Sequence, residues 1–142
     1  MTPYNKILVA VDLTDECGKI VERAKQIAAA SDASLHLVHV VEPISFAYGG
    51  DIPLDIASIQ EQILEQAKLH LNKFSSEFEI NKDYQHVLVG RPAIEMRTLA
   101  EEEDANLIVV GSHGRHGLAL LLGSTANGIL HGAPCDVLAV RV

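Results

Sequence analysis

A glycine-rich stretch in the last third of the chain contains the residue types that bind phosphate groups. It consists of three glycines with polar and basic residues between them: Gly111, Ser112, His113, Gly114, Arg115, His116 and Gly117. The apolar, β-branched run 107–110 precedes it and predicts a buried strand. Further on, Gly123-Ser124-Thr125 precedes a short helical run. Glycines let the backbone approach a phosphate, and N–H groups at a helix start point towards it, so this order of elements favours an anion site.

Side chains of the same region can add to such a site. The hydroxyls of Ser124 and Thr125 can donate hydrogen bonds, and Arg115 can supply positive charge. The region lacks the Gly-Lys-Ser/Thr ending of a P-loop, and the Gly-x-Gly-x-x-Gly fingerprint of a dinucleotide site does not occur in the chain. An alternative interpretation stays open, in which the glycines only shape a turn and Gly123 only permits close packing.

The composition of the chain is that of an ordinary globular domain. Its 142 residues, 48% hydrophobic and 21% charged, predict a single domain over 1–142. The 11 basic residues are scattered and are outnumbered by 19 acidic ones, which argues against a nucleic-acid-binding or membrane-binding surface. No run approaches transmembrane length and no signal peptide is recognisable, so we expect a cytoplasmic protein. Cys17 and Cys135 form no Cys-x-x-Cys pair, and we expect both thiols to be reduced.

Apolar runs and helical spacing alternate along the chain. The apolar runs predict strands at 6–12, 34–41, 84–89, 107–110 and 136–142. Helical spacing predicts helices at 14–31, 54–78 and 92–103, and a short helix that follows Gly123-Ser124 and ends near Gly132. Thr14 or Asp15 is the expected N-cap of the first helix. The segment 42–53 is the longest irregular piece. Such alternation predicts an α/β fold, an open parallel five-stranded sheet with helices on both faces.

The helix over 54–78 is the longest of the predicted elements. Its apolar side is expected to contain seven residues: Ile56, Ile59, Ile63, Ala67, Leu71, Phe74 and Phe78. Its opposite side carries charged residues that we expect to be solvated: Glu61, Glu65, Lys68 and Lys73.

The histidines do not predict a metal site. His36 and His39 point to opposite faces of their strand and cannot form a site together. His113 and His116 stand three apart in a loop without further convergent ligands. We interpret His113 as a phosphate or ribose contact and His116 as a surface residue. His86 belongs to the third strand.

Three separate segments are expected to meet at one edge of the sheet. In open parallel sheets a ligand binds at the carboxyl ends of strands that flank the topological switch, here next to the first strand. Asp12 ends the first strand, Val41 the second, and Gly111 the fourth. Their convergence favours a ligand site over a purely structural loop. Asp12 itself has two interpretations, a metal-linked acid or a cap for the following helix.

Three sequence segments also resemble the universal stress protein family. They are Ile-Leu-Val-Ala-Val-Asp at 7–12, Val-Gly-Ser-His-Gly-Arg-His-Gly at 110–117, and His-Gly-Ala-Pro-Cys-Asp-Val-Leu-Ala-Val at 131–140. The resemblance covers essentially the whole chain. It implies an adenine-nucleotide-binding-like α/β fold with strand order 3-2-1-4-5, a cytoplasmic location and a homodimer that pairs through the last strand, 137–141.

The family contains members that bind ATP and members that do not. Binders carry Gly-x-x-Gly, a gap of nine residues, and then Gly-Ser/Thr. Gly111, Gly114 and Gly123-Ser124 match this pattern, but the gap 115–122 has eight residues. The glycines favour nucleotide binding, and the shorter gap favours a nucleotide-independent member.

The resemblance also implies roles for individual residues. Asp12 would lie near the ribose or a phosphate-bound Mg²⁺, and the backbones of Ala10 and Val41 would contact the adenine. The ribose and the phosphates would be held by six residues: Gly111, Gly114, Arg115, Gly123, Ser124 and Thr125.

These inferences predict a stress-response regulatory protein that binds ATP, ADP or AMP as a homodimer and acts on an unidentified protein partner. Slow ATP hydrolysis is the most that we expect, because no strong general base or lysine clamp is visible. The alternative is a dimeric interaction protein in which the glycine loop is structural. Nucleotidyl transfer is the weakest hypothesis, because nothing indicates a second substrate pocket.

Overall fold

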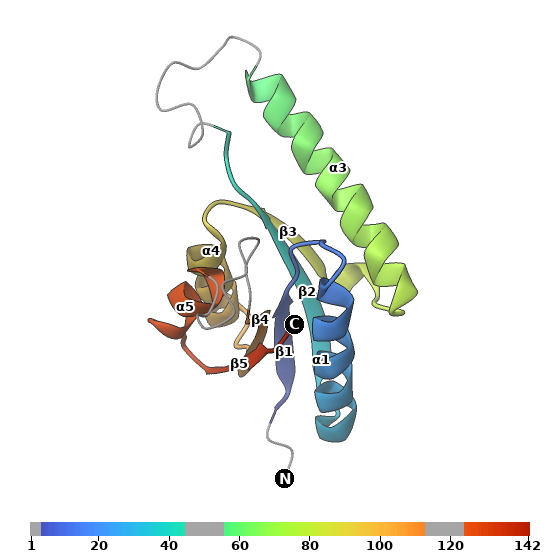
Figure 1. Ribbon diagram of the computed structural model, residues 1–142, viewed down its shortest axis with the longest axis vertical. Helices are drawn as coiled ribbons and strands as arrows, with labels where there is room; N and C mark the ends of the chain where they lie inside the picture. The colour runs from blue at the N-terminus through green and yellow to red at the C-terminus, as the bar shows by residue number, and fades with distance from the viewer. Residues whose placement is uncertain (1–3, 45–55, 113–123) are drawn as a thin grey trace.

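Five parallel strands form a single sheet in the part of the chain that the structure describes. The computed structural model describes residues 4–44, 56–112 and 124–142. The strands lie in the order β3-β2-β1-β4-β5, and every neighbouring pair is parallel (Figure 1). Their bounds are Lys6–Ala10 for β1, Ser34–Val41 for β2, Gln85–Val89 for β3, Leu107–Gly111 for β4 and Asp136–Val140 for β5. The expected α/β fold and strand order are confirmed.

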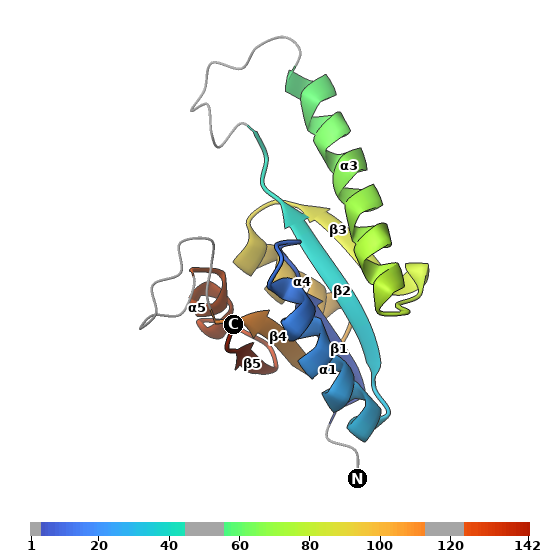
Figure 2. The ribbon, with the colours of Figure 1, turned by 45° about the vertical axis from the view of Figure 1, so that its right-hand side comes forward.

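Helices cover both faces of the sheet, α1 and α3 on one face and α4 and α5 on the other (Figures 1 and 2). Their bounds are Cys17–Ser31 for α1, Ile56–Glu77 for α3, Pro92–Glu102 for α4 and Ser124–Leu130 for α5. A short 3₁₀ helix η1, Lys82–Tyr84, leads into β3 and was not expected from the sequence. No helix in the described ranges combines the length and the apolar character that a membrane span requires.

The central strands are apolar on both sides because both sides are covered. On β1, Ile7 and Val9 pack in the core under α1, and Leu8 packs in the core under α4 and α5. All three side chains are 0% exposed. Continuous apolar runs are typical of parallel strands that are buried on both faces.

The apolar side of α3 differs from the prediction. Leu71 is buried and Phe74 packs on the core, but Ile59 and Ile63 are 46% and 39% exposed. The inner side of the first half instead contains Gln60, whose Oε1 accepts a hydrogen bond from the Ile44 amide at 2.8 Å. A helix of 22 residues is about 33 Å long. The five residues of β3 span only about 17 Å. The first half of α3 therefore extends beyond the sheet (Figure 1).

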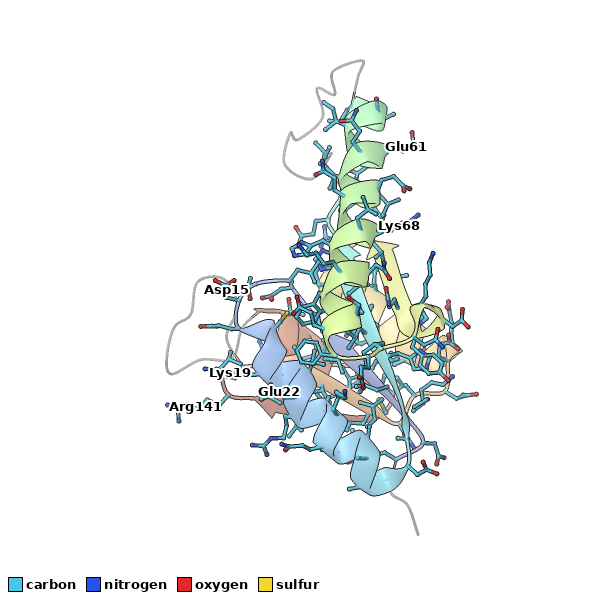
Figure 3. All side chains as sticks on the ribbon, turned by 90° about the vertical axis from the view of Figure 1, so that its right-hand side faces the viewer. Asp15, Lys19, Glu22, Glu61, Lys68 and Arg141 are labelled. Atoms are coloured by element: carbon cyan, nitrogen blue, oxygen red, sulfur yellow. The ribbon has the colours of Figure 1, made fainter. Side chains whose placement is uncertain are left out.

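The charged residues expected on the outer side of α3 are exposed, as are Lys19 and Glu22 of α1. Lys25 of α1 is half-buried and donates a hydrogen bond to Phe78 O at 2.7 Å. Figure 3 shows Lys19 and Glu22 on α1, and Glu61 and Lys68 on α3, away from the sheet. Lys68 forms an exposed ion pair with Glu65 at 3.4 Å. An exposed pair of this kind contributes little to stability.

Helices α4 and α5 approach closely through small residues. A Cβ atom added at Gly128 on α5 would lie 2.7 Å from the Cβ of Ala93 on α4. That separation is shorter than any normal contact between carbon atoms. The packing therefore requires glycine at position 128.

Replacing Gly128 by alanine is expected to destabilise the fold by about 1–3 kcal/mol, because the two helices must separate to admit the methyl group. Urea unfolding of the purified protein measures this change. Gly18→Ala on α1 is the matched control, since its added methyl group meets Phe78 at an ordinary 3.5 Å. Alanine favours a helix by up to about 1 kcal/mol over glycine, so the control is expected to be as stable as wild type or more stable. Equal stability of both variants would contradict the close helix packing.

Candidate functional site

The carboxyl ends of β1, β2 and β4 meet at one edge of the sheet. Strand β1 lies between β2 and β4. The chain adds β2 and β3 on one side of β1 and β4 and β5 on the other, so the topological switch point of the sheet lies beside β1. The ladder continues beyond the strands, because the Val11 amide donates to Val38 O at 2.9 Å and the Ser112 amide donates to Val140 O at 2.8 Å. This carboxyl edge, residues 10–12, 41 and 111–112, is where open parallel sheets bind ligands.

The carboxylate of Asp12 is fixed by the turn that follows β1. Its Oδ1 accepts hydrogen bonds from the Thr14 amide at 3.0 Å and the Thr14 hydroxyl at 2.7 Å. Among the described residues, no hydrogen bond to Oδ2 is found. Asp12 is exposed. The carboxylate is therefore held in one orientation with an oxygen available to a ligand donor.

The turn after β1 also corrects the expected helix start. Helix α1 begins at Cys17, and its N-cap residue is Glu16, which makes no side-chain capping bond. The predicted N-caps, Thr14 and Asp15, therefore precede the cap position. Leu13 has a φ of 61°, a left-handed conformation that bulky residues rarely adopt. Asp12 caps this turn and not the helix.

His39 holds the residue before Asp12. Its Nδ1 lies 2.8 Å from Val11 O, so Nδ1 carries a hydrogen and donates it to the carbonyl. His36 contacts His86 instead, which confirms that His36 and His39 do not form a site together. The sequence assigned His39 to a face of the strand but gave no signal of this contact, which depends on the pairing of β1 with β2.

The end of β2 is tied to the turn that leaves β3. Val41 O accepts a hydrogen bond from the Gly90 amide at 3.0 Å, and the Val41 residue is 8% exposed. Gly90 has a φ of 153°, and a Cβ there would lie 2.7 Å from the side chain of Glu95. A carbonyl oxygen has two lone pairs, so Val41 O keeps acceptor capacity after this bond.

The end of β4 presents the hydroxyl of Ser112, which belongs to the glycine-rich stretch but was not among the predicted site residues. Ser112 Oγ is buried and has no hydrogen-bond partner in the described part of the chain. Ser112 follows Gly111 directly, at the point where the glycine-rich stretch begins. A buried hydroxyl without a partner costs free energy, so this atom is a candidate donor or acceptor for a group bound at the edge.

The structure describes six of the ten predicted site residues. Ala10, Asp12, Val41 and Gly111 lie at the carboxyl edge, at or just past the ends of β1, β2 and β4. Ser124 and Thr125 begin α5, which packs against β4 and β5. The other four lie outside the described residues: His113, Gly114, Arg115 and Gly123.

The two cysteines are free, as expected. Burial first, and then the charge of Asp12, raise the pKa of the Cys17 thiol to about 11. The pKa of Cys135 is also raised, chiefly by burial. Across the described ranges, no group of three or more His, Cys, Asp or Glu side chains is arranged to hold a metal ion.

Comparison with known protein families identifies the family of this chain. Residues 3–141 match the model of the universal stress protein family. The chain belongs to the universal stress protein family. Universal stress protein A homolog 2 of Coxiella burnetii (strain RSA 493 / Nine Mile phase I) is 45% identical to it over 146 residues, which cover 100% of this chain and 98% of that protein.

Solved structures of universal stress proteins share the fold. The universal stress protein UspA from Lactobacillus plantarum superimposes with a TM-score of 0.82 at 21% identity, covering 99% of this chain and 100% of that one. A universal stress protein in complex with cAMP is 28% identical, with a TM-score of 0.63 and 98% coverage of each chain.

Proposed function

We propose that this universal stress protein binds an adenine nucleotide at the carboxyl edge and acts in the cytoplasm as a nucleotide-responsive regulatory homodimer. The observation that carries the proposal is the convergence of Asp12, Val41 and Gly111 from three strands at the topological switch. The family relative in complex with cAMP supports an adenine nucleotide as the class of ligand.

The edge offers surfaces suited to the base and the ribose. Ala10 is half-buried and Val41 is buried, so their backbones are firmly held where a flat base would contact them. Asp12, held by Thr14, is oriented in advance to accept a hydrogen bond from a ribose hydroxyl or to contact a phosphate-bound Mg²⁺. A group that is already fixed loses little conformational entropy when a ligand binds.

The phosphates are assigned to the end of β4 and the segment that follows it. Gly111 and the orphan hydroxyl of Ser112 lie where this segment begins. The residues proposed to complete the phosphate site are His113, Gly114, Arg115, Gly123, Ser124 and Thr125. ATP, ADP and AMP are all compatible with this assignment. We propose binding without efficient hydrolysis, so that occupancy alone changes what the dimer presents to a protein partner.

The dimer is proposed to form through β5. This strand lies at an edge of the sheet, so one side of its backbone lacks a neighbouring strand within the described chain. Its four apolar residues, Val137 to Val140, are all partly exposed. A second copy that pairs with residues 137–141 would cover both the backbone groups and these side chains.

Nucleotide binding is tested by the thermal midpoint with and without millimolar ATP and Mg²⁺, ADP, AMP or cAMP. A ligand at about a hundred times its dissociation constant adds about 2.7 kcal/mol, or about 5–10 °C for a chain of this size. Asp12→Asn keeps the oxygen that accepts from Thr14 but loses the charge, and we expect a smaller shift. Asp32→Asn is the matched control at the C-terminal end of α1, and its shift should equal that of wild type.

Absence of a shift with every nucleotide would contradict the proposal. The remaining hypothesis would then be the nucleotide-independent interaction protein with a structural glycine loop. If Asp12→Asn and Asp32→Asn reduced the nucleotide-induced thermal shift equally, the nucleotide would bind elsewhere than at the carboxyl edge.

The dimer is tested by light scattering after size exclusion. Wild type is expected at twice the chain mass of 15.3 kDa. Ala139→Lys places like charges near the two-fold axis of a β5 pair, and we expect a monomer. Val89→Lys is the matched control, because Val89 is 42% exposed on β3, the opposite edge strand. A wild-type monomer, or dissociation by Val89→Lys alone, would contradict pairing through β5.

A further inference from the structure

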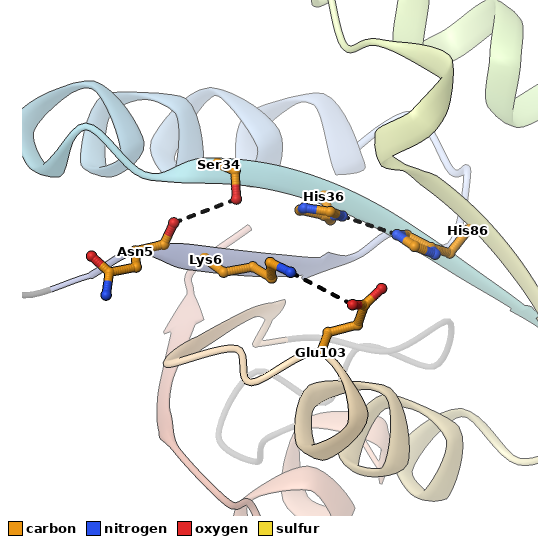
Figure 4. Close-up of polar contacts among 6 residues, drawn as sticks. All are labelled: Asn5, Lys6, Ser34, His36, His86 and Glu103. Atoms are coloured by element: carbon orange, nitrogen blue, oxygen red, sulfur yellow. Dashed lines mark hydrogen bonds and ion pairs between the residues drawn. The ribbon is translucent and has the colours of Figure 1, made fainter.

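Two histidines face each other across β2 and β3, towards the end of the sheet opposite the carboxyl edge. His36 Nδ1 lies 3.0 Å from His86 Nε2, and the two rings are stacked with centroids 5.2 Å apart (Figure 4). The ring of Tyr84 lies against His36 with a centroid separation of 4.5 Å. His36 is only 5% exposed. Residues from β2, β3 and η1 thus form one packed cluster.

Only one hydrogen can lie between the two nitrogens that face each other, His36 Nδ1 and His86 Nε2. A neutral imidazole carries a hydrogen on one nitrogen only, so one ring donates and the other accepts. A first added proton can sit on an outer nitrogen of the donating ring and leave this bond intact. A second proton would put N–H groups on both His36 Nδ1 and His86 Nε2, which then repel each other at 3.0 Å. The closed contact therefore cannot hold two imidazolium rings.

Charged groups on two other elements face the pair. Lys6 on β1 and Glu103, which follows α4, form an ion pair at 3.5 Å on the same side of the sheet (Figure 4). Burial, then the charges of His86 and Lys6, lower the pKa of His36 from 6.5 to about 4, against an opposing effect of Glu103. Burial also lowers the pKa of His86, which Glu103 raises and Lys6 lowers. The closed pair therefore favours neutral rings at pH 7.

Strand β3 is the element whose attachment to the sheet the histidine pair can strengthen. It is an edge strand of five residues, it pairs only with β2 among the described strands, and none of its residues is buried. The side-chain bond from His86 to His36 adds a second link between β3 and β2, beyond the backbone ladder. A short and partly exposed edge strand opens more readily than a central one.

We propose that the His36–His86 pair is an acid-sensitive lock, which joins the edge strand β3 to β2 when both rings are neutral and releases it when the rings take up protons. The proposal does not depend on the nucleotide site. Opened rings bind protons with an ordinary pKa near 6.5, whereas in the closed pair burial disfavours the first proton and the contact between the rings excludes the second. The closed state is therefore fully favoured above pH 6.5 and loses stability as the pH falls from 6.5 towards 4.

Amide hydrogen exchange at pH 7.5 and pH 5.0, corrected for the intrinsic exchange rate, tests the lock. In wild type the opening of β3 amides should increase about tenfold or more at pH 5.0, relative to the amides of β1 and β4. In His36→Gln and in His86→Gln, the glutamine amide donates to the remaining ring and does not titrate, so the increase should shrink in each variant. His70→Gln is the matched control, since His70 is exposed on α3 and lies outside the pair, and the full increase should persist.

Titration of the histidine rings in wild type by NMR provides a second measurement that needs no variant. His36 and His86 should remain neutral at pH values below 6.5, the ordinary pKa of a histidine, because the pKa of each is lowered in the closed pair. Unchanged protection of β3 between pH 7.5 and 5.0 would overturn the proposal. Protonation of both rings near pH 6.5 without opening of β3 would overturn it as well.

Discussion

The pairing of β1 with β2 on one side and β4 on the other is the constraint on which the rest of the structure depends. It places β1 in the centre of the sheet, where the helices on both faces bury Ile7, Leu8 and Val9 completely. Because all three strands are parallel, their carboxyl ends meet at one edge. The register continues to Val11 and Ser112 through backbone hydrogen bonds. Asp12 and Gly111 both follow the last printed pair of β1 with β4, Val9 with Val109, so they lie at the same edge of the sheet.

Strand β3 runs from the His36–His86 pair to the carboxyl edge of the sheet. Near its start, His86 bonds to His36. Past its end, the Gly90 amide bonds to Val41 O at the carboxyl edge. Only five residues separate η1 from this second contact, so both interactions act on one short strand. The proposed lock and the proposed nucleotide site are independent hypotheses, but the same edge strand supports them.

Local sequence patterns predicted the strands and the main helices. The features that they did not predict depend on tertiary geometry. Apolar runs identified all five strands, whereas their order came from the family resemblance, since hydropathy does not indicate which strands pair. Ile59 and Ile63 are exposed because α3 is longer than the sheet that it covers. The helical spacing of apolar residues does not indicate how far a helix extends beyond its sheet. The His36–His86 bond joins residues 50 positions apart and depends on register. The Asp12–Thr14 turn was accessible from the sequence, because aspartate commonly accepts from the backbone two residues on.

A map of amide chemical shifts of the isotope-labelled wild type during titration with ATP and Mg²⁺ tests the central claim most directly. The claim predicts saturable shifts of the amides at the carboxyl edge, among them Val11, Val41 and Ser112. The amides of Ser34 and Asn106, which lie at the opposite edge beside the starts of β2 and β4, should not move. The absence of saturable shifts, or shifts centred on the opposite edge, would contradict the account.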